Sequence, residues 1–290
     1  MTHTLSMVFF LIASIGTGMF IVERLWPASE QPVVRNWWAR VAVVNAIQLA
    51  IVVVAGLTWD RWMQGVSLLH ISDHLSFVPA SIVGYIVVTF IYYFWHRARH
   101  ESAFFWRLCH QLHHSPRRIE IVMSFYKHPV EIFVNSVISA AIAYPLLGCS
   151  PESASLITAL TAVSEFFYHW NIRTPRWFGY FFQRPESHRV HHEKDYHTNN
   201  YSDLPIWDMV FGTYENPITA PEECGFTASQ EDRIEDMLTF RNVIKAEAEG
   251  SQPLRFLPTC IGCSKRWACS RHQRIADQTS RATSPLAEQQ

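Results

Sequence analysis

The sequence predicts an all-α integral membrane protein, a bundle of about three spans plus a helical hairpin, with a histidine-rich helical cap on one side. Two observations on composition favour this fold class. Hydrophobic residues make up 49% of the 290 residues and charged residues only 17%, which is poor in charge for a soluble protein. The polarity is also uneven, because the chain is mostly apolar before Trp95, whereas histidines and arginines follow it.

Three apolar runs are long enough to cross a bilayer. They cover residues 5–22, 41–59 and 75–95, and each is close to the roughly 20 residues that a spanning helix needs. The first run has no basic region before it and no clear cleavage site of small residues after it, so we expect a retained span and not a signal peptide. The third run ends in aromatic residues, from Tyr92 to Trp95, which is typical of a membrane interface.

A fourth apolar region, residues 132–167, is too long for one straight span. It is interrupted by Pro145, Gly148 and the pair Ser150-Pro151. We therefore expect two helices folded as a hairpin, which enters the membrane and returns to the same side.

Basic residues alternate between the two sides of this arrangement. Arg24, Arg35 and Arg40 follow the first run, only Arg61 follows the second, and many arginines follow the third, whereas the hairpin tip has neither lysine nor arginine. The positive-inside rule then places the N-terminus outside and the segments after residues 95 and 167 on the cytoplasmic face.

Eight of the 15 histidines fall into three patterned motifs in those cytoplasmic segments. The motifs are H-x-x-x-H (His96, His100), H-x-x-H-H (His110, His113, His114) and H-x-x-H-H (His188, His191, His192). Positions i, i+3 and i+4 share one face of a helix, so each motif can aim imidazoles at one point. Neutral imidazole is a ligand for iron, zinc, copper and nickel. Packing these rings together without a metal would leave ring nitrogens poorly paired, so the motifs predict a multi-histidine centre with two metals.

These motifs in this order resemble the fatty acid hydroxylase/sterol desaturase superfamily of integral membrane di-iron enzymes. Further matches are the segments 128–131, 169–173, 200–201 and 207–214, so the resemblance covers about residues 80–217. The resemblance implies two iron ions held by histidines at the membrane surface, with O2 as co-substrate. The metal ligands that it implies are His96, His100, His110, His113, His114, His169, His188, His191 and His192.

Two departures from the superfamily pattern affect this expectation. Some members place a histidine four residues after the counterpart of His169, and this chain has Arg173 there. One metal then has a more open coordination shell, or His197 or His128 substitutes. Some members also carry a fused cytochrome b5 domain with the motif His-Pro-Gly-Gly, which this sequence lacks. We therefore expect a separate electron donor of the cytochrome b5, ferredoxin or reductase type.

The leading hypothesis is an O2-dependent di-iron hydroxylase that acts on an unactivated C–H bond of a membrane lipid: a fatty-acyl chain, a sterol or a polar lipid. A desaturase is the close alternative, since the same oxidant supports either outcome. A membrane zinc hydrolase is weakened by the lack of a His-Glu-x-x-His motif, and a non-enzymatic metal-binding relative is a further alternative. The net charge of -1 gives no sign of nucleic-acid binding. We expect a multi-pass protein of a bacterial inner membrane with the metal site facing the cytoplasm.

The chain divides by composition into four expected regions. Residues 1–95 hold the transmembrane spans, and residues 96–217 hold the catalytic histidine motifs, with the membrane hairpin 132–167 between them. We expect residues 218–250 to form a soluble extension of the cap, and the basic, serine-rich residues 251–290 to form a disordered tail. Cys260, Cys263 and Cys269 with His272 could in principle bind zinc, but their spacing is poor, and the flanking basic residues favour a disordered or membrane-touching tail.

Overall fold

The computed structural model describes residues 2–244, without the side chains of residues 2–7 and 9. The tail 251–290 with its cysteines lies outside the described residues. Within the described part every regular element is helical, and the one isolated β-bridge joins Glu193 to Cys224. This agrees with the predicted all-α class.

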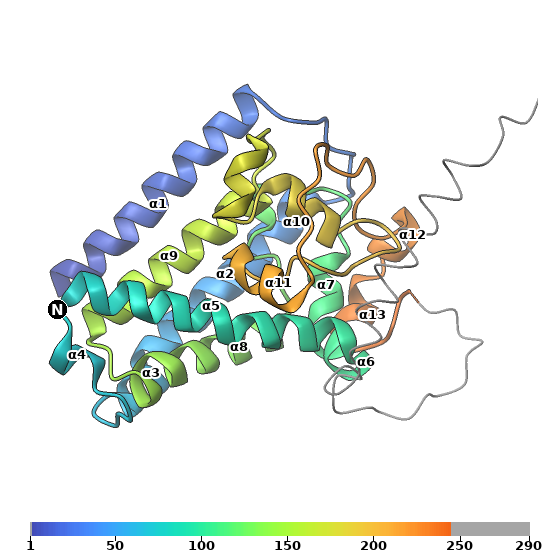
Figure 1. Cartoon of the computed structure of the whole chain (residues 1–290). Helices are drawn as coiled ribbons and strands as arrows, with labels where there is room; N and C mark the ends of the chain where they lie inside the picture. Colours follow the sequence, from blue (N-terminus) through green and yellow to red (C-terminus); the bar gives the residue numbers. More distant parts are fainter. Residues whose placement is uncertain (1, 245–290) are drawn as a thin grey trace, which may run out of the picture.

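Five long helices form the bundle, and most of the short helices form a cap at one end of it (Figure 1). The long helices are α1 (Thr2–Leu25), α2 (Trp37–Leu57), α5 (Phe77–Glu101), α8 (Pro129–Ala141) and α9 (Pro151–His169). The other α-helices are α3 (Trp59–Met63), α4 (Ile71–His74), α6 (Ala103–Phe105), α7 (Gln111–His114), α10 (Pro185–His191), α11 (Pro205–Phe211), α12 (Ala228–Glu231) and α13 (Ile234–Leu238). The π- and 3-10 turns are η1 (Trp106–His110), η2 (Ile121–Met123), η3 (Ile142–Leu146) and η4 (Arg176–Tyr180).

Three helical segments are long and apolar enough to cross a membrane. They are Trp37–Met63, Phe77–Glu101 and Pro129–Leu146, and they include two of the predicted runs and the first arm of the hairpin. The predicted run at residues 5–22 lies in α1, where most of the first side chains are outside the described part, so that span stays a prediction. The low buried share of Trp37–Met63, 11% of its most apolar window, means that its side chains face outward, as they would toward lipid.

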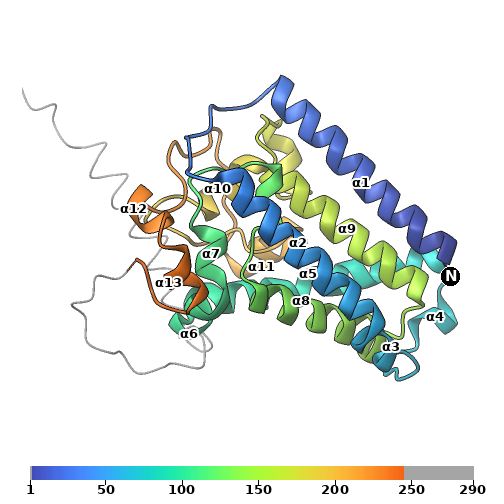
Figure 2. The same cartoon turned by 180° about the vertical axis from the view of Figure 1, so that it is seen from behind.

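The connections between the long helices lie at two opposite ends, as the two views in Figures 1 and 2 agree. At one end the segment before α4 pairs with the hairpin tip, where the amide of Leu68 donates to the carbonyl of Pro145. At the other end the segment after α1 pairs with the segment after α9, where the amide of Ala28 donates to the carbonyl of Asn171. The cap helices α6, α7, α10, α12 and α13 gather at this second end.

The hairpin has the two helical arms that its sequence predicts, α8 with η3 and then α9, and they are separated at Leu147–Ser150. Pro145 falls inside η3, where its missing N–H and its ring disturb the α-helical ladder. Pro151 then begins α9 and Ser150 caps it by accepting from the amide of Ser153. The two arms have different main partners, because α8 packs on α2 whereas α9 packs between α1 and α5.

A buried carboxylate fastens the cap to the first two long helices. Glu120 is fully buried and accepts hydrogen bonds from Trp37 Nε1 at 2.6 Å, Arg24 Nη2 at 2.6 Å and Arg118 Nε at 2.7 Å. Burial acts to raise the pKa of Glu120, but Arg118 and Arg24 outweigh it and lower that pKa. The residues come from α1, α2 and the cap, so the bundle and the cap share one rigid polar joint.

The described part of the predicted extension packs onto the cap. Met237 of α13 is fully buried in one hydrophobic cluster with Leu112 of α7 and Trp37 of α2. This cluster lies beside η1 and α7, which together carry His110, His113 and His114. The division of the chain into the four regions expected from composition stays a prediction.

Candidate metal centre

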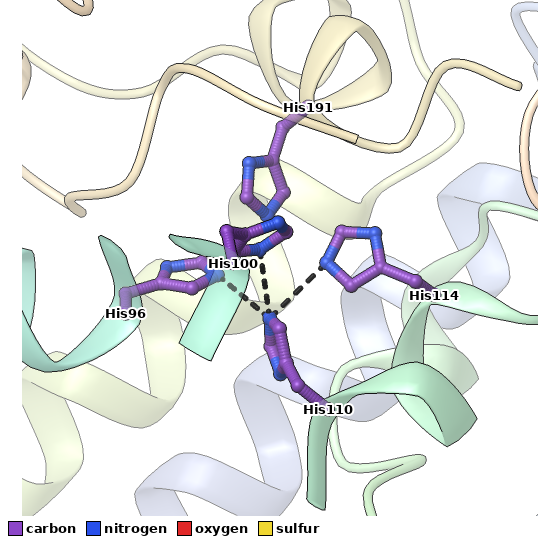
Figure 3. A group of neighbouring side chains, drawn as sticks. All are labelled: His96, His100, His110, His114 and His191. Atoms are coloured by element: carbon purple, nitrogen blue, oxygen red, sulfur yellow. Dashed lines mark hydrogen bonds between the residues drawn. The ribbon is translucent and has the colours of Figure 1, made fainter. Parts of the chain in front are cut away.

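The structure brings the nine predicted histidines together at the cap end of the bundle, in two neighbouring groups. Within each group, one possible ligand atom from every member lies within 4.8 Å of those of all the others. The first group, drawn in Figure 3, is His96, His100, His110, His114 and His191. The second group is His113, His169, His188 and His192. The two groups touch, since the rings of His114 and His192 stack with centroids 4.0 Å apart.

Each H-x-x-H-H motif contributes to both groups. The pair His110 and His114 lies in the first group and His113 in the second, whereas the pair His188 and His192 lies in the second group and His191 in the first. On an α-helix positions i and i+4 differ in direction by about 40°, but positions i+3 and i+4 differ by about 100°. Each motif therefore aims two of its imidazoles at one group, as its helical spacing allows, and the i+3 residue faces the other group.

Local helix geometry sets the position of these imidazole rings along the helix axes. The π-turn η1 ends at His110 and continues directly into α7, and single π-turns are frequent at functional sites. The helix α10 begins with Pro185 and ends at His191, so His192 is its C-terminal cap residue. Both helices are short and buried, so tertiary packing and not helix propensity holds them.

Five of the nine histidines donate Nδ1–H to a backbone carbonyl. A carbonyl oxygen only accepts, so the proton must lie on Nδ1 and Nε2 must present a lone pair. The pairs are His96 with Tyr201 O at 2.7 Å, His100 with His197 O at 2.8 Å, His113 with Tyr126 O at 3.1 Å, His169 with Glu165 O at 2.9 Å and His191 with Asn199 O at 2.6 Å. His110 is held in the same way by a carboxylate, with Nδ1 3.2 Å from both oxygens of Glu131.

The Nε2 atoms of these histidines lie close together, and none of them carries a proton that could form a hydrogen bond between them. His110 Nε2 lies 3.1 Å from His96 Nε2 and 3.0 Å from His100 Nε2, although all three rings carry their proton on Nδ1. Lone pairs at this distance repel each other unless a cation lies between them. With metal–nitrogen bonds of about 2.1 Å, neighbouring ligands at a right angle would be about 3.0 Å apart, which matches these spacings.

Two further features of the histidines fit a bound metal: buried ring nitrogens without a hydrogen-bond partner, and lowered pKa values that keep the rings neutral. His191 Nε2 and His192 Nδ1 are buried and have no hydrogen-bond partner among the described residues, which is costly for a polar atom unless something else binds it. Burial lowers the pKa of His169 and of His191 to about 3, although a carbonyl partner acts against it in each case. The rings are therefore neutral near pH 7, which is the form that binds metals. The residues present fit a pair of metal ions.

His188 is the one member whose hydrogen bond opposes ligation. Gln183 Nε2 lies 2.7 Å from His188 Nδ1 and also donates to the carbonyl of Asn200. In this arrangement His188 Nδ1 accepts, and the ring proton lies on Nε2, 3.1 Å from His169 Nε2. Binding of a metal at His188 Nε2 requires the Gln183 amide to turn over, so that its oxygen accepts from Nδ1.

One loop supplies three of the carbonyls that orient the first group. The carbonyls of His197, Asn199 and Tyr201 alternate along the loop after α10 and hold His100, His191 and His96 respectively. The loop turns sharply, with positive φ at Asp195 (61°), His197 (43°), Asn199 (67°) and Asn200 (49°). Sequence reasoning missed these backbone partners, and the pair Asn199-Asn200 was the signal that could have revealed them, since asparagine tolerates this conformation best after glycine.

Acidic residues complete the surroundings of the first group. Glu131 is fully buried, ion-pairs with Arg99 and holds His110. Asp208 acts through the backbone, because it accepts from the amides of Tyr201 at 2.8 Å and Ser202 at 2.9 Å. It thereby fixes the carbonyl that orients His96.

The residues expected to compensate for the departure at Arg173 do not join either group. His197 lies just outside the first group, with Nδ1 3.3 Å from His114 Nδ1. His128 caps α8 by accepting from the amide of Val130, and its Nε2 lies 3.4 Å from the carbonyl of Leu238. Arg173 itself is exposed. The second group thus has four histidines where the first has five, which is the more open arrangement.

A single cavity reaches both groups of histidines. Its wall includes His96 and His110 from the first group and His113 and His188 from the second. It extends between α5, α8 and α9, two of which belong to the helices long enough to span a membrane. A molecule in this cavity would contact both groups at once.

Comparison with known proteins agrees with this geometry. A protein-family model described as fatty acid hydroxylase matches residues 81–213. The matched region, a little under half of the chain, is similar to the fatty acid hydroxylase/sterol desaturase superfamily. The prediction made from the motifs is therefore confirmed, and the matched region contains all nine histidines. No solved structure matches the chain.

Similar curated proteins of the fatty acid hydroxylase superfamily act on different lipids. The chain is 32% identical over 141 residues to an ornithine lipid hydroxylase of Rhizobium tropici, covering 47% of this chain and 42% of that protein. It is 27% identical over 156 residues to a sphingolipid C4-hydroxylase of Schizosaccharomyces pombe, covering 49% and 53%. It is 30% identical over 131 residues to an alkylglycerol monooxygenase of Caenorhabditis elegans, covering 43% and 25%. The chain thus spans about half or less of the length of these relatives.

Proposed function

We propose that this protein is an O2-dependent di-iron hydroxylase that oxidises an unactivated C–H bond of a membrane lipid. The observation that carries the proposal is the cavity whose wall holds histidines of both groups. A substrate in that cavity would lie against two metals bound by neutral, oriented imidazoles. The three relatives named above share hydroxylation of a lipid, although their lipids differ.

In this proposal the nine histidines are the metal ligands. The first iron would be held by His96, His100, His110, His114 and His191, and the second by His113, His169, His188 and His192. Breaking an unactivated C–H bond needs O2 chemistry of a kind that bound iron supplies and no side chain can. The four-histidine group, with fewer protein ligands, leaves more room for a non-protein ligand.

The chain itself would contribute orientation, burial and substrate binding. Hydrogen bonds from Nδ1 set the direction of most of the rings, and such partners stabilise a ligand geometry and raise ligand basicity. Seven of the nine histidines are buried, so bulk water is kept from the reacting atoms. The long helices around the cavity would let a lipid enter from the side, while the cap faces water.

The membrane arrangement completes the proposal. The three candidate spans and the gathering of the cap at one end fit a multi-pass protein, with the metal centre at the membrane surface. The arginines of the cap side support a cytoplasmic position of that end, because the positive-inside rule puts basic loops there. Electrons would come from a separate donor of the cytochrome b5, ferredoxin or reductase type, since the described part of the chain holds no second redox site besides these histidines.

Metal analysis of the detergent-purified full chain tests the proposal. We expect about two irons per chain, with each of the variants His191→Ala and His113→Ala losing chiefly the metal of its own group. Arg173→Ala is the matched control, because Arg173 is exposed and outside both groups. Absence of metal, or zinc alone, would overturn the di-iron assignment in favour of a carrier or hydrolase. Mass spectrometry of lipids from producing cells then separates hydroxylation, which adds one oxygen atom, from desaturation, which removes two hydrogens.

A further inference from the structure

Carboxylates outnumber basic groups when the ion-pair partners behind the cavity wall are counted: Glu131, Glu165 and Asp203 face only Arg99 and Lys127. Lys127 forms an ion pair with Glu165 at 2.6 Å, and Arg99 forms one with Glu131. Lys127, Glu165 and Arg99 line the cavity directly. Each of these basic groups already has a carboxylate partner, so none is left to neutralise a further acid.

Asp203 is that further acid. It lines the same cavity, and among residues 2–244 it has no salt-bridge partner, while Tyr168 donates a hydrogen bond to it. Burial and then the charge of Glu165 raise the pKa of Asp203 to about 7, against the opposing effects of Lys127 and Tyr168. A partly buried carboxylate beside a second carboxylate lacks a cation, and a ligand can supply one.

The rest of the cavity has the form expected for a lipid lying with its polar end at the histidines. Along α5 the wall residues Val88, Tyr92, His96 and Arg99 follow one helix face. Val88 lies eight residues before His96, or about 12 Å along the axis, inside the segment able to span a membrane. An acyl or alkyl chain would lie toward Val88, and its polar group would reach the level of Asp203.

We propose that the cavity takes an amine-bearing polar lipid and that the Asp203 carboxylate binds the ammonium group. The inference rests on the proposed function of the same site and narrows its substrate class. A fatty acid or other anionic lipid would place a further negative charge against Asp203 and Glu165, which is unfavourable in a partly buried site. An uncharged alcohol would leave Asp203 without a counter-ion. Oxidation would then fall on carbons near the amine and not at the far end of the chain.

The test compares three probes of equal chain length on the iron-loaded full chain in a neutral detergent: hexadecylamine, hexadecanol and N-acetylhexadecylamine. Affinities are measured by thermophoresis at a fixed detergent concentration. We expect the amine to bind about 10-fold to 100-fold more tightly than the two uncharged probes, as for a hydrogen bond between charged groups. Asp203→Asn should remove this preference and leave hexadecanol binding unchanged, whereas Asp203→Glu should keep it.

The matched control is Asp232→Asn, since Asp232 is a half-exposed carboxylate paired with Arg40 away from the cavity. It should leave all three affinities unchanged. Equal binding of hexadecylamine and hexadecanol by the wild type overturns the inference, even if Asp203→Asn does not fold. A preference for hexadecylamine that persists in Asp203→Asn also overturns it. If either of these outcomes is found for a protein that binds iron and forms hydroxylated lipid, the proposed function still holds. A wild type that binds no iron rejects the proposed function, whatever the probes show.

Discussion

Removing the charge of Glu131 should weaken the first metal group selectively. Glu131 is fully buried and has two partners, the guanidinium of Arg99 and Nδ1–H of His110. His110 is central to the group, because its Nε2 lies within 3.1 Å of Nε2 of His96, His100 and His114. In Glu131→Gln the ring of His110 loses a charged acceptor, and Arg99 stays buried without a counter-ion.

Two magnitudes follow for Glu131→Gln. Loss of a partner that orients a metal-binding histidine costs about 10-fold to 100-fold in metal affinity, or about 1.4 to 2.8 kcal/mol. Breaking a buried ion pair by removing one charge costs about 3–5 kcal/mol of folding stability. We expect both effects, with metal lost from the five-histidine group first and the four-histidine group retained.

The assay is metal content after dialysis against graded chelator, together with thermal unfolding. Glu231→Gln is the control, since Glu231 is 3% exposed and ion-paired with Arg117 at 2.9 Å but contacts no histidine of either group. It should lower stability without a selective loss of one metal. The reasoning is refuted if Glu131→Gln and Glu231→Gln show the same chelator dependence, or if Glu131→Gln loses both metals together.

Three further changes have defined outcomes. Gly225→Ala should destabilise the cap by about 1–3 kcal/mol in thermal unfolding, because φ is +74° there and a Cβ would lie 2.2 Å from the carbonyl oxygen of Pro116; an unchanged melting temperature would contradict this. Arg184→Met should cost about 3–5 kcal/mol, since it leaves Glu186 without its ion-pair partner and removes donors to Thr174 O and Asn216 Oδ1; chemical denaturation measures it, and a loss below about 1 kcal/mol would oppose it. Amine-probe affinity should rise several-fold from pH 6 to pH 8 as Asp203 ionises around its pKa of about 7, and Asp203→Asn should show a flat profile.

The sign of that pH dependence follows from the groups around Asp203. Only the carboxylate form attracts an ammonium, and its fraction grows as pH passes through about 7, while a long-chain amine stays protonated. Glu165, Lys127, Tyr168 and Tyr85 face Asp203, and Glu165 forms an ion pair with Lys127. An affinity that falls with rising pH would exclude Asp203 as the group responsible.

The sequence by itself determined the helical class, two of the helices that are long and apolar enough to span a membrane, the two-armed hairpin and the identity of the nine clustered histidines. These features rest on local patterns: apolar runs of spanning length, proline and glycine breaks, and histidines at helical spacing. The resemblance to the superfamily followed from the same residues, since the order and spacing of the motifs are carried by the chain itself.

Only the tertiary structure decided how the histidines are shared between two groups. The spacing i, i+3, i+4 indicates one helix face, but whether neighbouring rings converge or diverge depends on which other helices approach that face. The sequence also did not reveal which backbone carbonyls orient the rings, those of His197, Asn199 and Tyr201. Nor did it reveal that Asp203 lacks an ion-pair partner among the described residues. Hydrogen bonds from backbone atoms and the balance of charge in a cavity depend on segments that are distant in the chain and meet only when it is folded.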